Sequence, residues 1–307
     1  LFEAFGGKVA NHTGAKTGLR TITSDTLDYT ESFLADRGGK VVIASMVQAL
    51  DAPNRLAILG STDDGLNFNQ MLVPSQYPGH EEGTMYVQGD PSVAIDSTGT
   101  AWVFGHELKF MAAGCNDPMR IVTHSKLVLA SVGDDFPATI EPIDAPWDVA
   151  SPPGGTYLDH PMIAITSDDR QHFVWWDLTA SGAPIMYRTR MPSQVLGSPG
   201  TDPVQVSTAL GTPFVLSGSG NNVYLHDRTF LCTLSGSAGL SCASDLIGMT
   251  NAVSGCPTSP IEIPGTSSDL RGPGASLTAS PTLTGHLYFA YVCTDGAGTA
   301  CDLGQSQ

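Results

Sequence analysis

The chain has 307 residues and a formal net charge of −16, because 30 acidic residues outnumber 14 lysines and arginines. This charge argues against nucleic acid and anionic membrane surfaces as partners, since both would repel the chain. Apolar residues make up 41% of the sequence, enough for a substantial core, yet no apolar run approaches the ~20 residues of a membrane-spanning helix. We therefore expect a folded chain that neither binds nucleic acid nor inserts into a membrane.

Short β-branched and aromatic runs recur between turn residues, and helical periodicity is almost absent. In the clearest copy, the run 91–95 passes through the turn 96–99 into the run 100–104. Similar hairpins lie at 33–43, 161–176, 214–225 and 283–291. The five copies recur about every 50–70 residues, a period that suits four-stranded propeller blades.

These repeats predict an all-β fold, a β-propeller of four-stranded antiparallel blades that forms a single domain over 1–307. The predicted blades lie near 29–75, 86–143, 157–208, 212–264 and 271–307. Since the last copy ends soon after its second strand, residues 1–28 are expected to supply a closing strand, with five blades, six blades or an incomplete propeller left open. A β-sandwich with irregular loops is the alternative fold.

The segment 61–68, with the sequence Ser-Thr-Asp-Asp-Gly-Leu-Asn-Phe, follows the third predicted strand. It resembles the Asp-box (BNR) motif of the sialidase superfamily, which forms the turn between the third and fourth strands of a blade. In such a turn the Ser and Asp oxygens accept backbone N–H bonds, and Gly supplies a positive φ. Weaker echoes stand at 131–136 and 235–242. The motif predicts the fold rather than catalysis, because binding proteins and enzymes share it.

The resemblance also implies an arginine triad that binds a carboxylate, and a tyrosine nucleophile with a glutamate partner. Arg120, Arg228 and Arg271 are the candidates to bind a ligand, with surface ion pairing as their alternative role. The sequence departs from the family before the Asp-box, where Arg20-Thr21-Ile22 stands in place of an Arg-Ile-Pro segment. Tyr157 is a candidate to stack on a sugar or to act as the nucleophile.

Four carboxylates lie at the ends of the innermost predicted strands: Asp90, Glu107, Asp159 and Asp177. Glycosidases need two carboxyl groups, one as the acid and one ionised, so these are the candidate catalytic residues. The alternative is that they are solvated or cap backbone amides. Because first strands converge on a propeller axis, we expect Asp90 and Asp159 to lie close together. Ligands should contact the loops 69–90, 107–119 and 144–159 rather than the Asp-box turn.

Six cysteines and the absence of C-x-x-C spacing favour disulfides over zinc, with buried free thiols as the alternative. The predicted local bridges are Cys232–Cys242 and Cys293–Cys301, and they suit a secreted or cell-surface protein. No metal is predicted at the candidate site residues, and no organic cofactor is expected. The loops Asp134-Asp135 and Asp168-Asp169 are candidates for structural calcium.

Two functions follow from this sequence. The first is a secreted or cell-surface recognition module for a carbohydrate or an extracellular protein. The second is a sialidase-like glycoside hydrolase that uses the carboxylates of the loop-rich rim. The missing arginine segment favours the first.

Overall fold

A computed structural model of the chain describes residues 28–48, 53–76, 84–111, 121–133, 141–150, 156–191, 193–194, 203–207, 215–219, 222–226, 231–235, 239–243, 275–279 and 287–291. The chain divides into two compact units, one formed by Asp25–Gly211 and the other by Leu1–Ser24 together with Thr212–Gln307. The regular elements of the described residues are all strands, so the prediction of an all-β fold is confirmed. No helix long and apolar enough to cross a membrane occurs among these residues.

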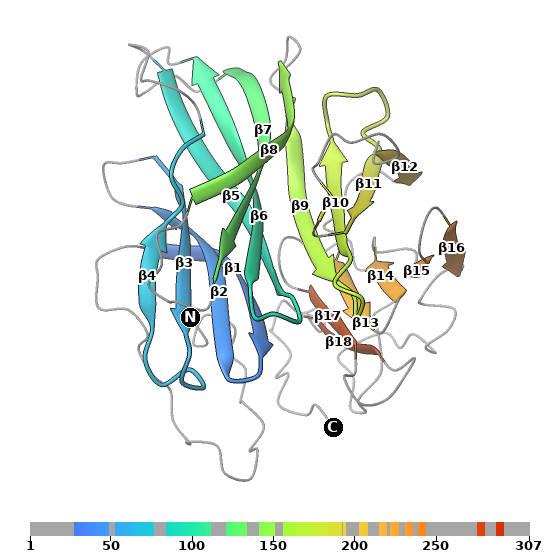
Figure 1. Ribbon diagram of the computed structural model, residues 1–307. Helices are drawn as coiled ribbons and strands as arrows, with labels where there is room; N and C mark the ends of the chain where they lie inside the picture. The colour runs from blue at the N-terminus through green and yellow to red at the C-terminus, as the bar shows by residue number, and fades with distance from the viewer. Residues whose placement is uncertain are drawn as a thin grey trace, which may run out of the picture. The chain divides into compact units, whose positions relative to one another are not determined.

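The unit Asp25–Gly211 contains three antiparallel sheets, each built from four strands that pair in chain order (Figure 1). The first sheet comprises β1 (Asp28–Arg37), β2 (Lys40–Gln48), β3 (Arg55–Ser61) and β4 (Asn69–Leu72). The second comprises β5 (Thr84–Ile95), β6 (Ala101–Met111), β7 (Ile121–Val132) and β8 (Glu141–Ala150). The third comprises β9 (Leu158–Ile165), β10 (Gln171–Asp177), β11 (Ile185–Arg190) and β12 (Val204–Ser207).

Among its described residues, the other unit has a sheet of four strands and a sheet of two. The larger consists of β13 (Val215–Ser219), β14 (Asn222–His226), β15 (Leu231–Ser235) and β16 (Gly239–Ala243), and the smaller of β17 (Ala275–Ala279) and β18 (Leu287–Tyr291). The second sheet continues to Ala150, past the predicted end at 143. The number of blades, closure into a propeller and a single domain over 1–307 stay predictions, and the proposed closing strand within 1–27 lies outside the described residues.

Apolar side chains fill the spaces between neighbouring sheets of the unit Asp25–Gly211. On β6, Val103 belongs to the core shared with the first sheet, whereas the next residue, Phe104, belongs to the core shared with the third. Val128 and Leu129 divide in the same way on β7. Successive strand residues point to opposite faces, so a sheet covered on both faces needs apolar residues at consecutive positions. This explains why the inner strands show apolar runs rather than alternation.

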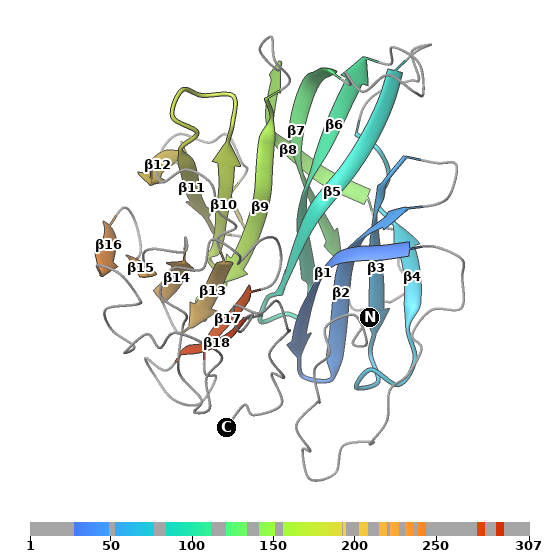
Figure 2. The ribbon, with the colours of Figure 1, turned by 180° about the vertical axis from the view of Figure 1, so that it is seen from behind.

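The first strands of successive sheets pack against one another, β1 against β5 and β5 against β9 (Figure 1, Figure 2). Polar groups add links between sheets. The ammonium group of Lys40, which is buried, donates to the carbonyl oxygens of Gly99 at 2.6 Å and Gly133 at 2.7 Å. Two buried serines of the second sheet accept hydrogen bonds from the backbone of β9. The Leu158 amide donates to Ser125 Oγ at 3.0 Å, and the Ile163 amide donates to Ser92 Oγ at 2.9 Å.

Candidate functional site

Matching irregularities interrupt β5 and β9. Two residues of β5, Asp90 and Pro91, lie opposite a single residue of β6, because the register runs from the pair Gly89–His106 directly to Ser92–Phe104. The strand β9 repeats this with His160 and Pro161. These are β-bulges, which accommodate proline because it has no N–H for the ladder, and which redirect side chains.

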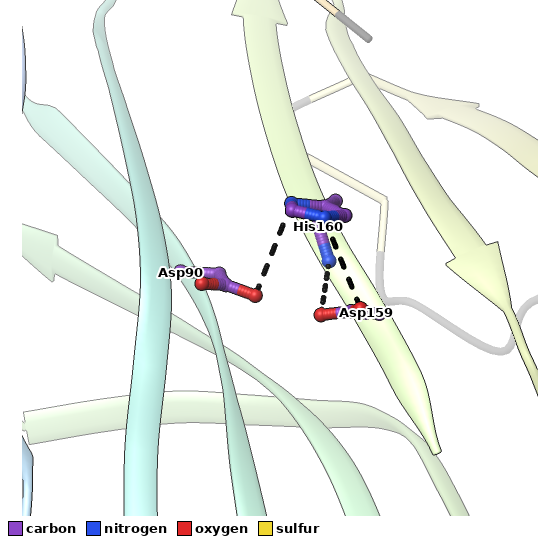
Figure 3. Close-up of side chains that lie close together, drawn as sticks. All are labelled: Asp90, Asp159 and His160. Carbon is purple, nitrogen blue, oxygen red and sulfur yellow. Dashed lines mark hydrogen bonds and ion pairs between the residues drawn. The ribbon is translucent and has the colours of Figure 1, made fainter. Parts of the chain in front are cut away.

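The residue before each proline takes a left-handed backbone conformation, with φ of 47° at Asp90 and 45° at His160. Such a conformation costs a residue other than glycine of order 1–3 kcal/mol, and it persists where the surrounding structure enforces it. Both bulges turn these side chains towards the same place between β5 and β9 (Figure 3).

Two carboxylates and an imidazole meet there, and we call Asp90, Asp159 and His160 the inner cluster. Each residue offers one nitrogen or oxygen atom, and these atoms all lie within 4.8 Å of one another. The His160 ring spans the two acids, with Nδ1 4.0 Å from Asp90 Oδ2 and Nε2 3.8 Å from Asp159 Oδ2 (Figure 3). The proximity of Asp90 and Asp159 that the sequence predicts is therefore present, while their catalytic roles stay predictions.

A second imidazole, that of His106 on β6, lies next to the two carboxylates of the inner cluster. Its Nδ1 is 3.5 Å from Asp90 Oδ2 and 3.9 Å from Asp159 Oδ1, and the residue is 6% exposed. The Tyr157 ring stands edge-on to it, with ring centroids 6.1 Å apart. Glycine is needed opposite His106, because a Cβ on Gly89 would lie 2.9 Å from His106 Nε2. Of the predicted ligand-binding residues, Tyr157 thus lies beside the site.

The inner cluster is partly exposed to solvent. The side chains of Asp90, Asp159 and His160 are 19%, 13% and 34% exposed. Trp176, half-buried on β10, stacks on the His160 ring with 21° between the ring planes. The arrangement offers carboxylate acceptors, imidazole nitrogens and an aromatic ring to a ligand that approaches from solvent.

Glu107, one residue after His106, has a different environment, because neighbouring strand residues face opposite sides of a sheet. It is fully buried and is not a member of the inner cluster. Its carboxylate accepts from the backbone N–H of Gln76 at 3.0 Å and from Gln88 Nε2 at 2.8 Å. Gln88 Oε1 in turn accepts from the Leu56 amide at 3.1 Å and from Arg55 Nε at 3.2 Å. Glu107 therefore joins the chain after β4 to the second sheet.

Asp177 ends β10 and is likewise outside the inner cluster. Its Oδ1 accepts from the backbone N–H groups of Thr179 at 3.0 Å and Ala180 at 3.2 Å. This is an Asx-type turn, in which the carboxylate caps the chain that leaves the strand. The alternative interpretation of strand-end carboxylates, as caps of backbone amides, describes Asp177.

The aspartates proposed for calcium are engaged in turns where the structure describes them. Asp168 accepts from Thr166 Oγ1 at 2.6 Å and forms an ion pair with Arg170 at 3.5 Å. The hydrogen bond from Thr166 is the main cause of the lowered pKa of Asp168. Asp169 accepts from the backbone N–H of Ser97 at 2.7 Å and from its hydroxyl. Asp134 and Asp135 lie outside the described residues.

The turn between β3 and β4 has the hydrogen bonds that its residues predict. Ser61 Oγ accepts from the Gly65 N–H at 2.9 Å, and Asp63 Oδ1 accepts from the Asn67 N–H at 2.9 Å. Gly65 has a φ of 74°. The hydrogen bonds from the Asn67 backbone and Ser61 lower the pKa of Asp63 to about 2. The likeness of this turn to the Asp-box motif remains a resemblance.

Other predicted residues fall outside the description. Arg120, Arg228 and Arg271 are not described, and neither are Cys293 and Cys301. The backbones of Cys232 and Cys242 are described, and they lie directly opposite each other on β15 and β16. Facing Cα atoms of an antiparallel pair are ~4.5–5.5 Å apart, within the range that a disulfide spans. The bridge itself stays a prediction.

Sequence reasoning missed both histidines and Trp176. The sequence does carry a signal for His160, because two of the repeated runs begin with a proline, Pro91 in one and Pro161 in the other. The residue before each proline, Asp90 in one copy and His160 in the other, is the equivalent bulge position. His106 carried no comparable signal, since its role depends on the glycine that faces it across the ladder.

In the unit Asp25–Gly211, sheets of four consecutive antiparallel strands pack through their first strands, and the all-β fold of the chain is similar to that of solved sialidases. The solved structures similar to it include the Hadza microbial sialidase Hz136 (20% identity, 82% of this chain, 50% of that one, TM-score 0.50). They also include the leech intramolecular trans-sialidase (11% identity, 77% of this chain, 54% of that one, TM-score 0.50). A third is the NanB sialidase from Streptococcus pneumoniae (8% identity, 87% of this chain, 57% of that one, TM-score 0.51).

The chain therefore spans about half the length of these structures. At such low identity the likeness concerns the fold alone. The sequence matches no known protein family and no curated protein.

Proposed function

We propose that this chain is a carbohydrate-recognition module, part of a secreted or cell-surface β-propeller, and that the inner cluster is its binding site. The observation that carries the proposal is the convergence of Asp90, Asp159 and His160 within 4.8 Å on the first strands of two sheets. The sialidase-like fold of the chain supports the proposal, since the similar solved structures include sialidases by name. An extracellular protein ligand is the alternative partner.

The chemistry of the inner cluster suits sugar hydroxyls. A carboxylate accepts hydrogen bonds from hydroxyl groups, and two carboxylates within 4.8 Å can hold adjacent hydroxyls of one ring. Trp176 and Tyr157 bring aromatic rings to the same place, and an apolar sugar face stacks on such rings. A few polar groups in a partly buried, partly aromatic setting are typical of small-molecule sites.

The charge of the site favours neutral sugars. Two carboxylates in a chain of net charge −16 repel an anionic glycan. An anionic sugar would need nearby arginines such as Arg120, Arg228 or Arg271 to overcome this field. We therefore propose a neutral glycan as the ligand, with sialylated glycans as the comparison that tests the choice.

One observation favours hydrolysis as a second candidate function. In retaining glycosidases the two carboxyl groups are ~5–5.5 Å apart, whereas inverting enzymes need ~6.5–9.5 Å to admit a water molecule. One oxygen of Asp90 and one of Asp159 lie no more than 4.8 Å apart, which is below the spacing that inverting enzymes need. If the chain cleaves glycosides, we expect retention of configuration at the anomeric carbon.

A glycan array followed by titration calorimetry tests recognition. We expect binding of neutral glycans by the wild-type chain, loss in Asp90→Asn and Asp159→Asn, and no change in Asp63→Ala, which alters only the turn at 61–68. Equal loss in Asp63→Ala, with every variant folded, would contradict the assignment of the site. Fluorogenic glycosides test hydrolysis, because turnover that disappears in Asp90→Asn would make the chain an enzyme.

A further inference from the structure

We propose that the inner cluster, with His106, binds a divalent transition-metal ion, and that this ion contacts the hydroxyls of the carbohydrate; the second part rests on the proposed function. The residues are two carboxylates and two imidazoles contributed by β5, β6 and β9. Sequence analysis predicted no metal at these positions.

The distances fit a metal centre that closes slightly when it is loaded. Zinc takes nitrogen and oxygen ligands at ~2.0–2.2 Å, so two ligands at a tetrahedral angle are about 3.4 Å apart. The pairs in the structure are 3.5 Å for His106 and Asp90, 3.8 Å for His160 and Asp159, and 3.9 Å for His106 and Asp159. The remaining pair, His160 and Asp90, is 4.0 Å apart, and the three atoms of the inner cluster lie within 4.8 Å of one another, so these side chains must close by up to about 1.4 Å to reach ligand distances.

His106 provides an observation independent of the three residues of the inner cluster. Its imidazole is buried, and the residue is 6% exposed. Its Nδ1 lies 3.5 Å from Asp90 Oδ2 and 3.9 Å from Asp159 Oδ1. Gly89 leaves the space for this ring, because a Cβ there would collide with it. The three residues of the inner cluster are enough for an open centre with three protein ligands, and His106 lies next to both of its carboxylates.

His160 can supply one nitrogen to the ion, because both Nδ1 and Nε2 lie next to an acid of the inner cluster.

The donor set also selects the kind of ion. Calcium and magnesium prefer oxygen ligands, and calcium takes six to eight of them, whereas imidazole suits zinc, nickel, cobalt or iron. We therefore expect zinc and cobalt to bind far more tightly than calcium. A bound ion also offsets the repulsion between Asp90 and Asp159, and the partial exposure of His160 leaves one side open for sugar hydroxyls.

The experiment uses the full chain, freed of metal with a chelator and titrated with Co²⁺ and then Zn²⁺. Visible absorption by Co²⁺ reports nitrogen and carboxylate coordination, and calorimetry gives the affinity. We expect one site, displacement of Co²⁺ by Zn²⁺, and at least a ~100-fold loss of affinity in Asp90→Asn and His160→Asn, since loss of an outer partner alone costs ~10–100-fold. Asparagine is chosen because it tolerates the left-handed conformation of both positions.

Asp36→Asn, which alters an exposed carboxylate of β1, is the matched control and should bind like the wild type. Failure of the wild-type chain to bind Co²⁺ or Zn²⁺, or equal binding by the wild type and the variants Asp90→Asn and His160→Asn, would overturn the metal site. Glycan binding that persists in excess chelator would overturn the role of the ion in sugar contact. Metal binding without any glycan binding would support the site and refute the proposed function, so the two failures are distinguishable.

Discussion

Replacement of Glu107 by alanine should destabilise the unit Asp25–Gly211 strongly. The change removes the acceptor of two donors, the Gln76 N–H at 3.0 Å and Gln88 Nε2 at 2.8 Å, and Gln88 is itself 1% exposed. A hydrogen bond to a charged group contributes ~1.5–3 kcal/mol. Because Gln76 is half-buried and water can replace part of its bond, we expect a loss of about 3 kcal/mol.

Urea unfolding followed by tryptophan fluorescence measures this loss, because all four tryptophans lie between residues 25 and 211. With a slope of roughly 2–3 kcal/mol per molar urea, the midpoint should fall by about 1 M. Glu107→Gln retains an acceptor oxygen for one of the two donors and should lose about half as much. Asp36→Ala serves as the control and should change stability by less than ~0.5 kcal/mol. A loss below ~1 kcal/mol in Glu107→Ala would refute the reasoning.

Three further predictions concern other parts of the chain. Gly89→Ala should displace His106 and reduce ligand binding at the inner cluster. Gly133→Ala, where a Cβ meets no atom within 4 Å, should leave binding unchanged. Equal ligand affinities of the two variants in a binding titration would contradict this prediction. Burial of His172 lowers its pKa to about 4, so below the ordinary value of ~6.5 only the unfolded chain takes up the proton. Stability should therefore fall by roughly 2–3 kcal/mol as the pH drops from ~6.5 to ~4, and acid titration of His172→Gln should show a shallower fall. Non-reducing peptide mapping should recover a Cys232–Cys242 bridge, and two free thiols there would exclude it.

The fold was predictable where apolar residues occupy consecutive positions. Runs such as 101–104 and 127–130 place one residue in each of two cores, as Val103 and Phe104 do. This pattern distinguishes a sheet covered on both faces from one that faces water. The hydrogen bonds that join neighbouring sheets had no such signal. Lys40, for example, donates to carbonyl groups that lie about sixty or more residues away in the chain.

The candidate site was predictable only in part, and the bulges explain why. Asp90 and Asp159 were found because they stand at the beginnings of inner strands. Glu107 was grouped with them because both hairpin ends open on one side, but the side chain of His106, not that of Glu107, faces Asp90. A bulge shifts the alternation of a strand by one residue, so which of two neighbours faces a site cannot be read from spacing alone.

The hydrogen bonds along β9 have a consequence for self-association. This strand ends its sheet, and an unprotected strand edge invites another chain to pair with it, but most of β9 is buried where it packs against β5. Here the amides of Leu158 and Ile163 already donate to serine hydroxyls, and the amide of His160 donates to Asp159 Oδ1 at 3.0 Å. Pro161 has no N–H to offer. The edge next to the site is thus protected from strand addition by β5, which packs against it, and by side chains that accept from its amides.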